Sequence, residues 1–177
     1  MSSKTKAMTQ IALVAALICI LGPITIPIGP VPISLTPFAI FLGVYVLGTW
    51  KGTLSVVIYL LIGLCGLPVF SGFTGGAAKL FGPTGGYLIA YVLTALIAGF
   101  FIDRFYGSIP LQVVGMLLGL AVLYGVGTFW LAHQASMTLS EAAAAGVWPF
   151  VALDLVKLAA AVVLGRAVRN ALIKAGT

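Results

Sequence analysis

Asp154 and Lys157 lie inside a long apolar segment that begins at Pro149 and continues to Leu164. On a helix, residues three apart share a face and lie about one turn from each other. A charge at the centre of a membrane-spanning helix costs about 2.5–3.5 kcal/mol on insertion scales, so it usually faces a protein interior or a cavity. The two charges form either a self-neutralising ion pair or a site for a ligand or ion. We favour the site, because buried charges are a costly way to hold helices together.

The composition indicates an integral membrane protein. Of the 177 residues, 62% are hydrophobic and only 7% are charged, with three acidic side chains in all. This is too little charge for a solvated surface, so we expect a single domain, residues 1–177, in the cell membrane and in contact with lipid. The net charge of +6 then reports orientation rather than nucleic-acid binding. Without a Cys/His cluster at metal-ligand spacing, we expect no metal and no cofactor.

The apolar periodicity predicts an all-α membrane protein with six transmembrane helices, at about residues 8–21, 38–48, 53–64, 85–105, 111–132 and 149–166. Two of these, 38–48 and 53–64, are shorter than the ~20 residues that span a bilayer. We expect a tight turn at 50–52 between them. Six spans place both termini on one side, and that side collects seven of the nine basic residues. The positive-inside rule therefore places both termini in the cytoplasm. The seven are Lys4, Lys6, Lys51, Arg104, Arg166, Arg169 and Lys174.

Two irregular segments fall on the opposite side. Residues 22–37 contain five prolines among apolar residues, which predicts a stiff, non-helical lid or plug. Residues 66–87 contain seven glycines and two prolines, which indicates a loop whose backbone approaches another group closely. Thr84 is a predicted N-cap of the following helix, whose free N–H groups attract anions. Lys79 adds a positive charge to this loop, although a lipid-headgroup contact is an equal interpretation.

These segments converge with the charged pair. A capping-box pattern, Thr138 to Glu141, predicts a short helix that runs to Gly146 before the last span. At 1.5 Å per residue, Asp154 lies about 7 Å and Lys157 about 12 Å below the start of that span. The sequence therefore predicts a ligand pocket that opens outward and is covered by loops.

Small residues indicate two helix-packing faces. Ala12 and Ala16 form a small-xxx-small face on the first helix, and Gly115 and Gly119 form a second on the fifth. Small side chains let two helix backbones approach closely in a membrane. Alanine as ordinary membrane filler explains the first face equally well.

The Pro-rich segment, the Gly66–Tyr87 run and the pair Asp154 and Lys157 resemble the BioY family over essentially the whole chain. The most specific parts are residues 82–87 (GPTGGY) and the charged pair. Members are the substrate-binding S components of energy-coupling-factor biotin transporters in bacterial inner membranes. The resemblance implies six helices and high-affinity biotin binding from outside. It also implies two kinds of partner, a transmembrane coupling subunit and two ATP-binding-cassette ATPases. Asp154 and Lys157 would bind biotin, and Ala12 and Ala16 would meet the coupling subunit.

Biotin chemistry fits these residues. The ureido ring offers two N–H donors beside a carbonyl acceptor, which complement a carboxylate and an ammonium group. Apolar walls would come from aromatic side chains and glycines of the loop. The valerate carboxylate needs a cation or free N–H groups, from Lys79 or the helix start at Thr84 and Gly85. The expected wall residues are Phe73, Gly75, Gly76, Phe81 and Tyr87.

Other functions remain open on the residues alone. One is an S component for a different vitamin, although the cation of thiamine would not suit Lys157. A second is a biotin carrier that works without the ATPase module. An intramembrane enzyme would need a Ser/His/Asp arrangement or a metal set, and the sequence shows neither. A channel would need polar residues through the whole depth, and we expect none in the cytoplasmic halves of the helices.

Overall fold

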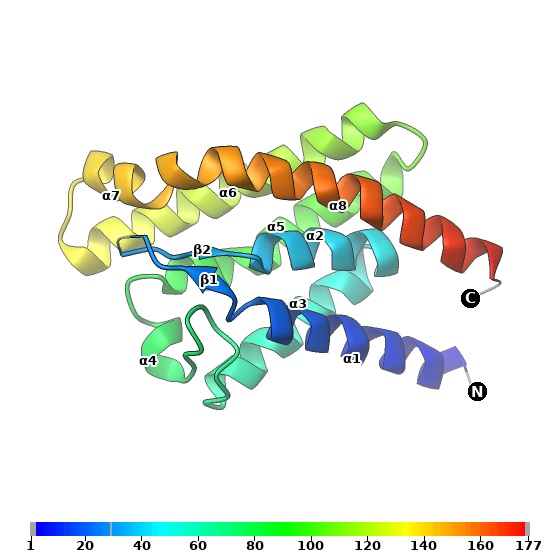
Figure 1. Ribbon diagram of the computed structural model, residues 1–177, viewed down its shortest axis with the longest axis horizontal. Helices are drawn as coiled ribbons and strands as arrows, with labels where there is room; N and C mark the ends of the chain where they lie inside the picture. Colours follow the sequence, from blue (N-terminus) through cyan, green and yellow to red (C-terminus); the bar gives the residue numbers. More distant parts are fainter. Residues whose placement is uncertain (1–2, 29, 176–177) are drawn as a thin grey trace.

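The computed structural model describes residues 3–28 and 30–175, which form eight helices and one short β-hairpin (Figure 1). Strands β1 (Thr25–Ile26) and β2 (Ile33–Ser34) pair antiparallel, with Thr25 opposite Ser34. The helices are α1 (Ser3–Leu21), α2 (Thr36–Leu47), α3 (Thr49–Leu64), α4 (Ala77–Leu80), α5 (Gly85–Arg104), α6 (Ile109–Ala135), α7 (Leu139–Gly146) and α8 (Trp148–Lys174).

The fold is that of an all-helical membrane protein. Helices α1, α5 and α6 are long and apolar enough to cross a membrane. If the bent pair α7–α8 is counted as one span, the described residues contain four candidate spans. Helices α2 and α3 have only 12 and 16 residues, as their short apolar runs predicted. Large apolar side chains such as Phe100, Phe129 and Val163 are exposed on the outer faces, where lipid would cover them.

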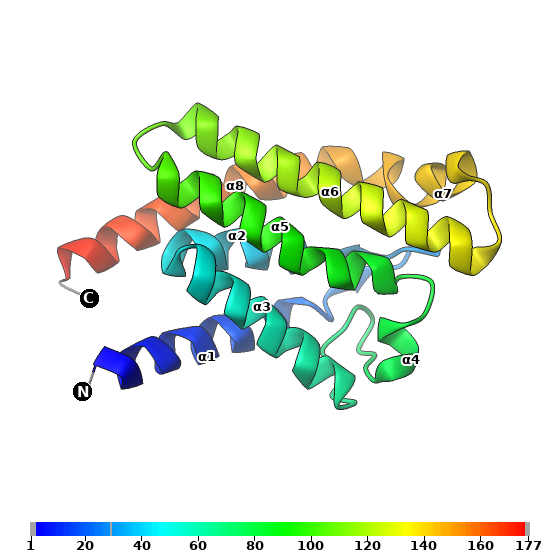
Figure 2. The same ribbon diagram turned by 180° about the vertical axis from the view of Figure 1, so that it is seen from behind.

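Helix α2 forms the centre of the bundle, with α3, α5 and α8 packed around it (Figure 2). Its residues Ile40, Phe41, Val44 and Tyr45 are fully buried. This burial explains why its sequence is apolar on every face rather than on one stripe. Helix α1 begins and α8 ends at the same end of the bundle, which we call the terminal end (Figure 1). The hairpin, α4 and α7 lie at the opposite end.

Helices α5 and α6 lie side by side, and the predicted glycine face of α6 makes this contact. A Cβ on Gly115 would overlap the side chain of Phe101, and a Cβ on Gly119 would lie 3.2 Å from Thr94. The Thr94 hydroxyl donates to the Gly119 carbonyl at 3.1 Å. The prediction of a small-residue packing face on this helix is therefore confirmed.

Two local predictions were wrong. Residues 50–52 form no turn but lie in the first turns of α3, because the Asp103 carboxylate accepts hydrogen bonds at 2.7 Å from both Thr49 N–H and Thr49 Oγ1. The chain turns instead at Gly48, which has a φ of 80° that favours glycine. Pro37 lies inside the first turn of α2 rather than in the irregular segment. Proline is tolerated there, since its missing N–H would have no helical partner.

The other local signals hold. Residues 22–28 and 30–35 are non-helical, and the capping box is formed, with Thr138 Oγ1 accepting from the Glu141 N–H and the Glu141 carboxylate accepting from the Thr138 N–H. Residues 66–84 of the glycine-rich run form a loop whose helical part is the single turn α4, and α5 begins at Gly85. This loop is fixed by backbone hydrogen bonds from Gly76 to the Gly63 carbonyl and from Gly72 to the Pro23 carbonyl.

A buried polar cluster lies near the terminal end, where we expected none. The fully buried Gln112 accepts hydrogen bonds from Tyr45 Oη at 2.9 Å and Arg166 Nη1 at 3.2 Å. Its amide group donates to the carbonyls of Phe105 and Tyr106. The expectation of apolar helix halves was wrong. However, both polar ends of the Gln112 side chain are hydrogen-bonded, as a structural cluster requires.

Replacing Gly115 by Ala should lower the free energy of unfolding by about 1–3 kcal/mol, because the added methyl group overlaps Phe101 in a close-packed interface. The matched control is Gly125→Ala on the same helix, where a Cβ meets nothing within 4 Å. Thermal unfolding of both variants in detergent, followed by tryptophan fluorescence, measures the difference. Equal midpoints would contradict the assigned packing.

Candidate ligand-binding site

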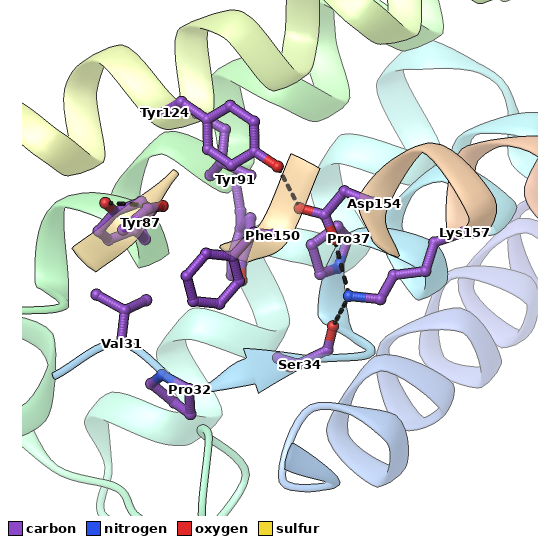
Figure 3. Close-up of a pocket in the computed structure, with 12 residues that line it drawn as sticks. Val31, Pro32, Ser34, Pro37, Tyr87, Tyr91, Tyr124, Phe150, Asp154 and Lys157 are labelled. Carbon is purple, nitrogen blue, oxygen red and sulfur yellow. Dashed lines mark hydrogen bonds and ion pairs between the residues drawn. The ribbon is translucent and has the colours of Figure 1, made fainter. Parts of the chain in front are cut away.

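Asp154 and Lys157 form the centre of a buried polar site on α8 (Figure 3). The Lys157 ammonium donates to Asp154 Oδ1 at 2.8 Å, and the Asp154 residue is only 3% exposed. Lys157 also donates to the backbone carbonyl of Ser34 at 2.6 Å, and Tyr124 Oη donates to Asp154 Oδ2 at 2.6 Å. The pair thus joins α8 to strand β2 and to helix α6.

The pair retains hydrogen-bonding capacity beyond these contacts. An ammonium group has three donors, and Lys157 uses two of them among the described residues. A carboxylate has about four acceptor positions, and Asp154 uses two. The site can therefore donate one hydrogen bond and accept two. This pattern complements a ligand group with a carbonyl oxygen beside N–H donors.

The pair faces a small cavity of about 40 Å³. A second cavity of about 30 Å³ shares five of its lining residues, so the two are adjacent. These volumes match one or a few water molecules, so a larger ligand requires movement of the hairpin or of the aromatic side chains. The shared residues are Val31, Pro32, Ser34, Tyr87 and Tyr91; the first cavity adds Pro37, Leu123, Tyr124, Gly146, Phe150, Asp154 and Lys157.

Tyr87 forms one wall and is held in place by two glycines. A Cβ on either Gly127 of α6 or Gly146 of α7 would overlap the Tyr87 side chain. Its hydroxyl lies 3.3 Å from the Gly146 carbonyl, to which it donates, and 3.4 Å from Thr128 Oγ1. Glycines far apart in the sequence therefore create the space that this aromatic wall occupies.

Of the residues predicted for the site, the structure brings Asp154, Lys157 and Tyr87 together at the first cavity. Thr84 lines the second cavity, and Gly85 follows it at the start of α5. Thr84 occupies the predicted N-cap position, but its side chain makes no capping hydrogen bond. The N-terminal end of α5 is thus adjacent to the cavities.

The other predicted residues of the glycine-rich run, Phe73, Gly75, Gly76, Lys79 and Phe81, line neither cavity. Phe73 is 70% and Phe81 is 58% exposed. Gly75 packs against the backbone of Leu67, which explains the absence of a side chain there, and Gly76 has a φ of 86°. Lys79 lies half-buried on α4, and burial lowers its pKa below the usual value. Their roles in ligand binding stay predictions.

Four polar or aromatic lining residues of the first cavity escaped the sequence analysis. Tyr91 is four residues after Tyr87, and Phe150 is four residues before Asp154. Residues four apart share a helix face, so this spacing from two predicted site residues would have identified both. Tyr124 comes from α6 and carries no such signal, because the contact spans 30 residues. Ser34 contributes a backbone carbonyl to Lys157, and a carbonyl leaves no trace in side-chain types.

Ala12 and Ala16 are exposed on α1, where they line an apolar groove of about 440 Å³ between α1 and α3. The neighbouring Ala15 is 2% exposed and packs into the bundle. The short alanine side chains therefore leave room for the groove on this face of α1. None of the residues that line this groove lines either cavity.

Known proteins match the chain over nearly its whole length. The model of the BioY family matches residues 1–174. The chain belongs to the BioY family. A relative from Thermotoga maritima, named biotin transporter BioY, is 40% identical over 84% of this chain and 87% of its own. A probable biotin transporter BioY from Pyrococcus horikoshii is 39% identical over 91% of this chain and 94% of its own.

A solved structure supports the same assignment. The crystal structure of the S-component for biotin from an ECF-type ABC transporter matches with a TM-score of 0.87. The two chains are 36% identical, and the match covers 96% of this chain and 95% of the other. The BioY fold therefore extends over the hairpin, the glycine-rich loop and all the long helices.

In this BioY chain, replacing Lys157 by Met should destabilise the fold by about 3–5 kcal/mol, because it leaves the buried Asp154 carboxylate without its ion-pair partner. The double variant Asp154→Asn/Lys157→Met should recover much of this loss, since no unpaired charge remains. Thermal unfolding of the wild type, both single variants and the double variant gives the coupling free energy. A double variant that is as unstable as the sum of both single ones would contradict a coupled pair.

Proposed function

We propose that this protein binds biotin with high affinity and takes it up as the membrane-embedded S component of an ATP-driven vitamin transporter. The observation that carries the proposal is the Asp154–Lys157 pair, whose remaining donor and acceptor positions face a cavity. The relatives are named biotin transporters, and the similar crystal structure is that of an S-component for biotin, which supports biotin over other vitamins.

In this proposal the ureido ring of biotin binds next to the Asp154–Lys157 pair. The two ureido N–H groups donate to the Asp154 carboxylate, and the ureido carbonyl accepts from Lys157. Tyr87, Tyr91 and Phe150 supply the aromatic walls for the fused rings (Figure 3). The valerate chain extends through the second cavity, so its carboxylate meets the start of α5 or Lys79.

The membrane arrangement follows from the positions of the charges. We propose six spans, in which loops at the cavity end occupy the depth that α2 and α3 leave open. Basic residues gather at the terminal end, which places both termini in the cytoplasm. The cavities lie at the opposite end, near the hairpin and α7, and so open toward the outside (Figure 1).

The β1–β2 hairpin acts as the lid of the pocket. Val31, Pro32 and Ser34 line both cavities, and Lys157 holds the hairpin through the Ser34 carbonyl. The Ser34 hydroxyl in turn contacts the Gly22 carbonyl and Thr36 Oγ1 at the two ends of the segment. Biotin entry breaks the Lys157–Ser34 contact and so moves the lid, while the ureido carbonyl accepts from the third donor of Lys157.

The partners follow from the groove on α1. We propose that a transmembrane coupling subunit packs against Ala12 and Ala16, where small side chains permit close helix approach. The sequence contains no nucleotide-binding motif, so a pair of ATP-binding-cassette ATPases supplies the energy. A solitary biotin carrier is the second candidate, and it would leave this apolar groove without a protein partner.

Titration calorimetry of the purified protein in detergent tests the ligand, with thiamine and riboflavin as controls. We expect tight one-to-one binding of biotin without any partner subunit. Binding of a control vitamin in its place would assign the protein to another substrate. A folded protein that binds none of the three would refute the proposed function.

Replacing Asp154 by Asn should weaken biotin binding by about 1–3 kcal/mol, because a charged hydrogen-bond acceptor is lost. The matched control is Glu141→Gln, which neutralises an exposed carboxylate in a capping box that accepts Gln equally. Calorimetry on both variants measures the change, and their unfolding midpoints verify that both are folded. Unchanged affinity in the Asp154 variant would remove this residue from the site.

A further inference from the structure

A basic groove of about 400 Å³ lies at the terminal end, between α1, α2, α3 and α8. Lys6, Lys51 and Arg169 line it together with the amide side chain of Gln10. These four residues come from three separate helices, so the fold rather than a local charge run brings the cations together. The groove is lined from the start of α1 and the last turns of α8, which lie at the terminal end, whereas the hairpin and α7, which line the first cavity, lie at the opposite end (Figure 1).

The positive charge of this groove is not balanced from within the protein. Arg169 donates to Asp103 Oδ1 at 2.9 Å and to the Tyr45 carbonyl at 3.3 Å. Within the described part of the chain, the ammonium groups of Lys6 and Lys51 have no ion pair or hydrogen bond, and no acidic side chain lines the groove. The remaining acids of the chain are Asp154 and Glu141, and both are engaged at the other end. Among the described side chains the groove therefore carries an excess of positive charge, which favours binding of an external anion.

We propose that this groove binds the phosphate of an anionic phospholipid headgroup in the cytoplasmic leaflet. Basic pockets between membrane helices on this side are suited to acidic lipid headgroups. An Arg fork and two Lys ammonium groups match phosphate oxygens, and the Gln10 amide adds a neutral donor. Apolar lining residues such as Val46 and Ile173 accompany the cations. This apolar part favours a lipid over free inorganic phosphate, since acyl chains gain contact there.

The groove is distinct from the alanine groove proposed for the coupling subunit. Lys6, Ala7 and Gln10 line the basic groove, whereas Met8, Ile11 and Ala12 line the apolar one. On a helix these two sets of positions lie on different faces of α1. A headgroup can therefore occupy the basic groove while a protein covers the alanine face.

Native mass spectrometry of the full chain in detergent tests the proposal, with phosphatidylglycerol and phosphatidylcholine of identical acyl chains as probes. We compare the wild type with Lys6→Gln/Lys51→Gln and with Lys4→Gln/Lys174→Gln. The second pair removes the same charge from exposed lysines outside the groove. Each cation near an anionic lipid strengthens binding about five-fold, so the groove variant should bind phosphatidylglycerol about 20-fold more weakly. The control pair should change it less than about two-fold.

The outcomes separate the alternatives. Selective loss of phosphatidylglycerol in the groove variant, with unchanged biotin affinity, supports the lipid site independently of the proposed transport function. Equal losses in both variants, or equal binding of phosphatidylcholine, would overturn it. Full displacement of the lipid by inorganic phosphate would assign the groove to the free anion instead. Unchanged lipid binding with weaker association of the coupling subunit would make the groove a protein contact.

Discussion

The buried ion pair between Lys157 and Asp154 is the interaction on which the rest of the site depends. Neither charge is tolerable alone in an apolar bundle, so each must be matched by charge and by hydrogen bonds. The structure matches them with groups from three elements: Tyr124 on α6, the Ser34 carbonyl on β2 and the pair itself on α8. The electrostatic requirement of two residues therefore fixes where the hairpin and two long helices meet.

Packing by small residues supplies the remaining precision of the site. Gly127 and Gly146 leave room for the Tyr87 side chain, which forms a wall of the cavity. Gly115 and Gly119 bring α6 against α5, so that Tyr87 of α5 and Tyr124 of α6 approach the same cavity. Without these glycines the helices would separate by the size of a side chain. The pocket thus depends on glycines whose missing side chains create the space for its walls.

The sequence predicted the long helices and the central pair because both produce rare signals. Long apolar runs are unusual in soluble proteins, and two charges inside such a run are unusual in membrane helices. The Thr49 cap and the Ser34 contact were missed, since Asp103 lies 54 residues from Thr49 and a backbone carbonyl has no side-chain signature. The loop residues Phe73 and Lys79 were proposed from composition. Their placement depends on long-range backbone contacts such as Gly72 with Pro23, which composition does not encode.

Helix α8 carries polar groups at both ends of the molecule. Asp154 and Lys157 hold the hairpin at one end, while Arg169 binds Asp103, the residue that caps α3, at the other. Lys157, which bonds the hairpin, and Arg169 are 12 residues apart, or about 18 Å along the helix. A helix is stiff over this length, so a tilt of α8 that releases Ser34 also displaces Arg169 relative to α2 and α3. If the proposed lid opens by a tilt of α8, the basic groove therefore moves with it.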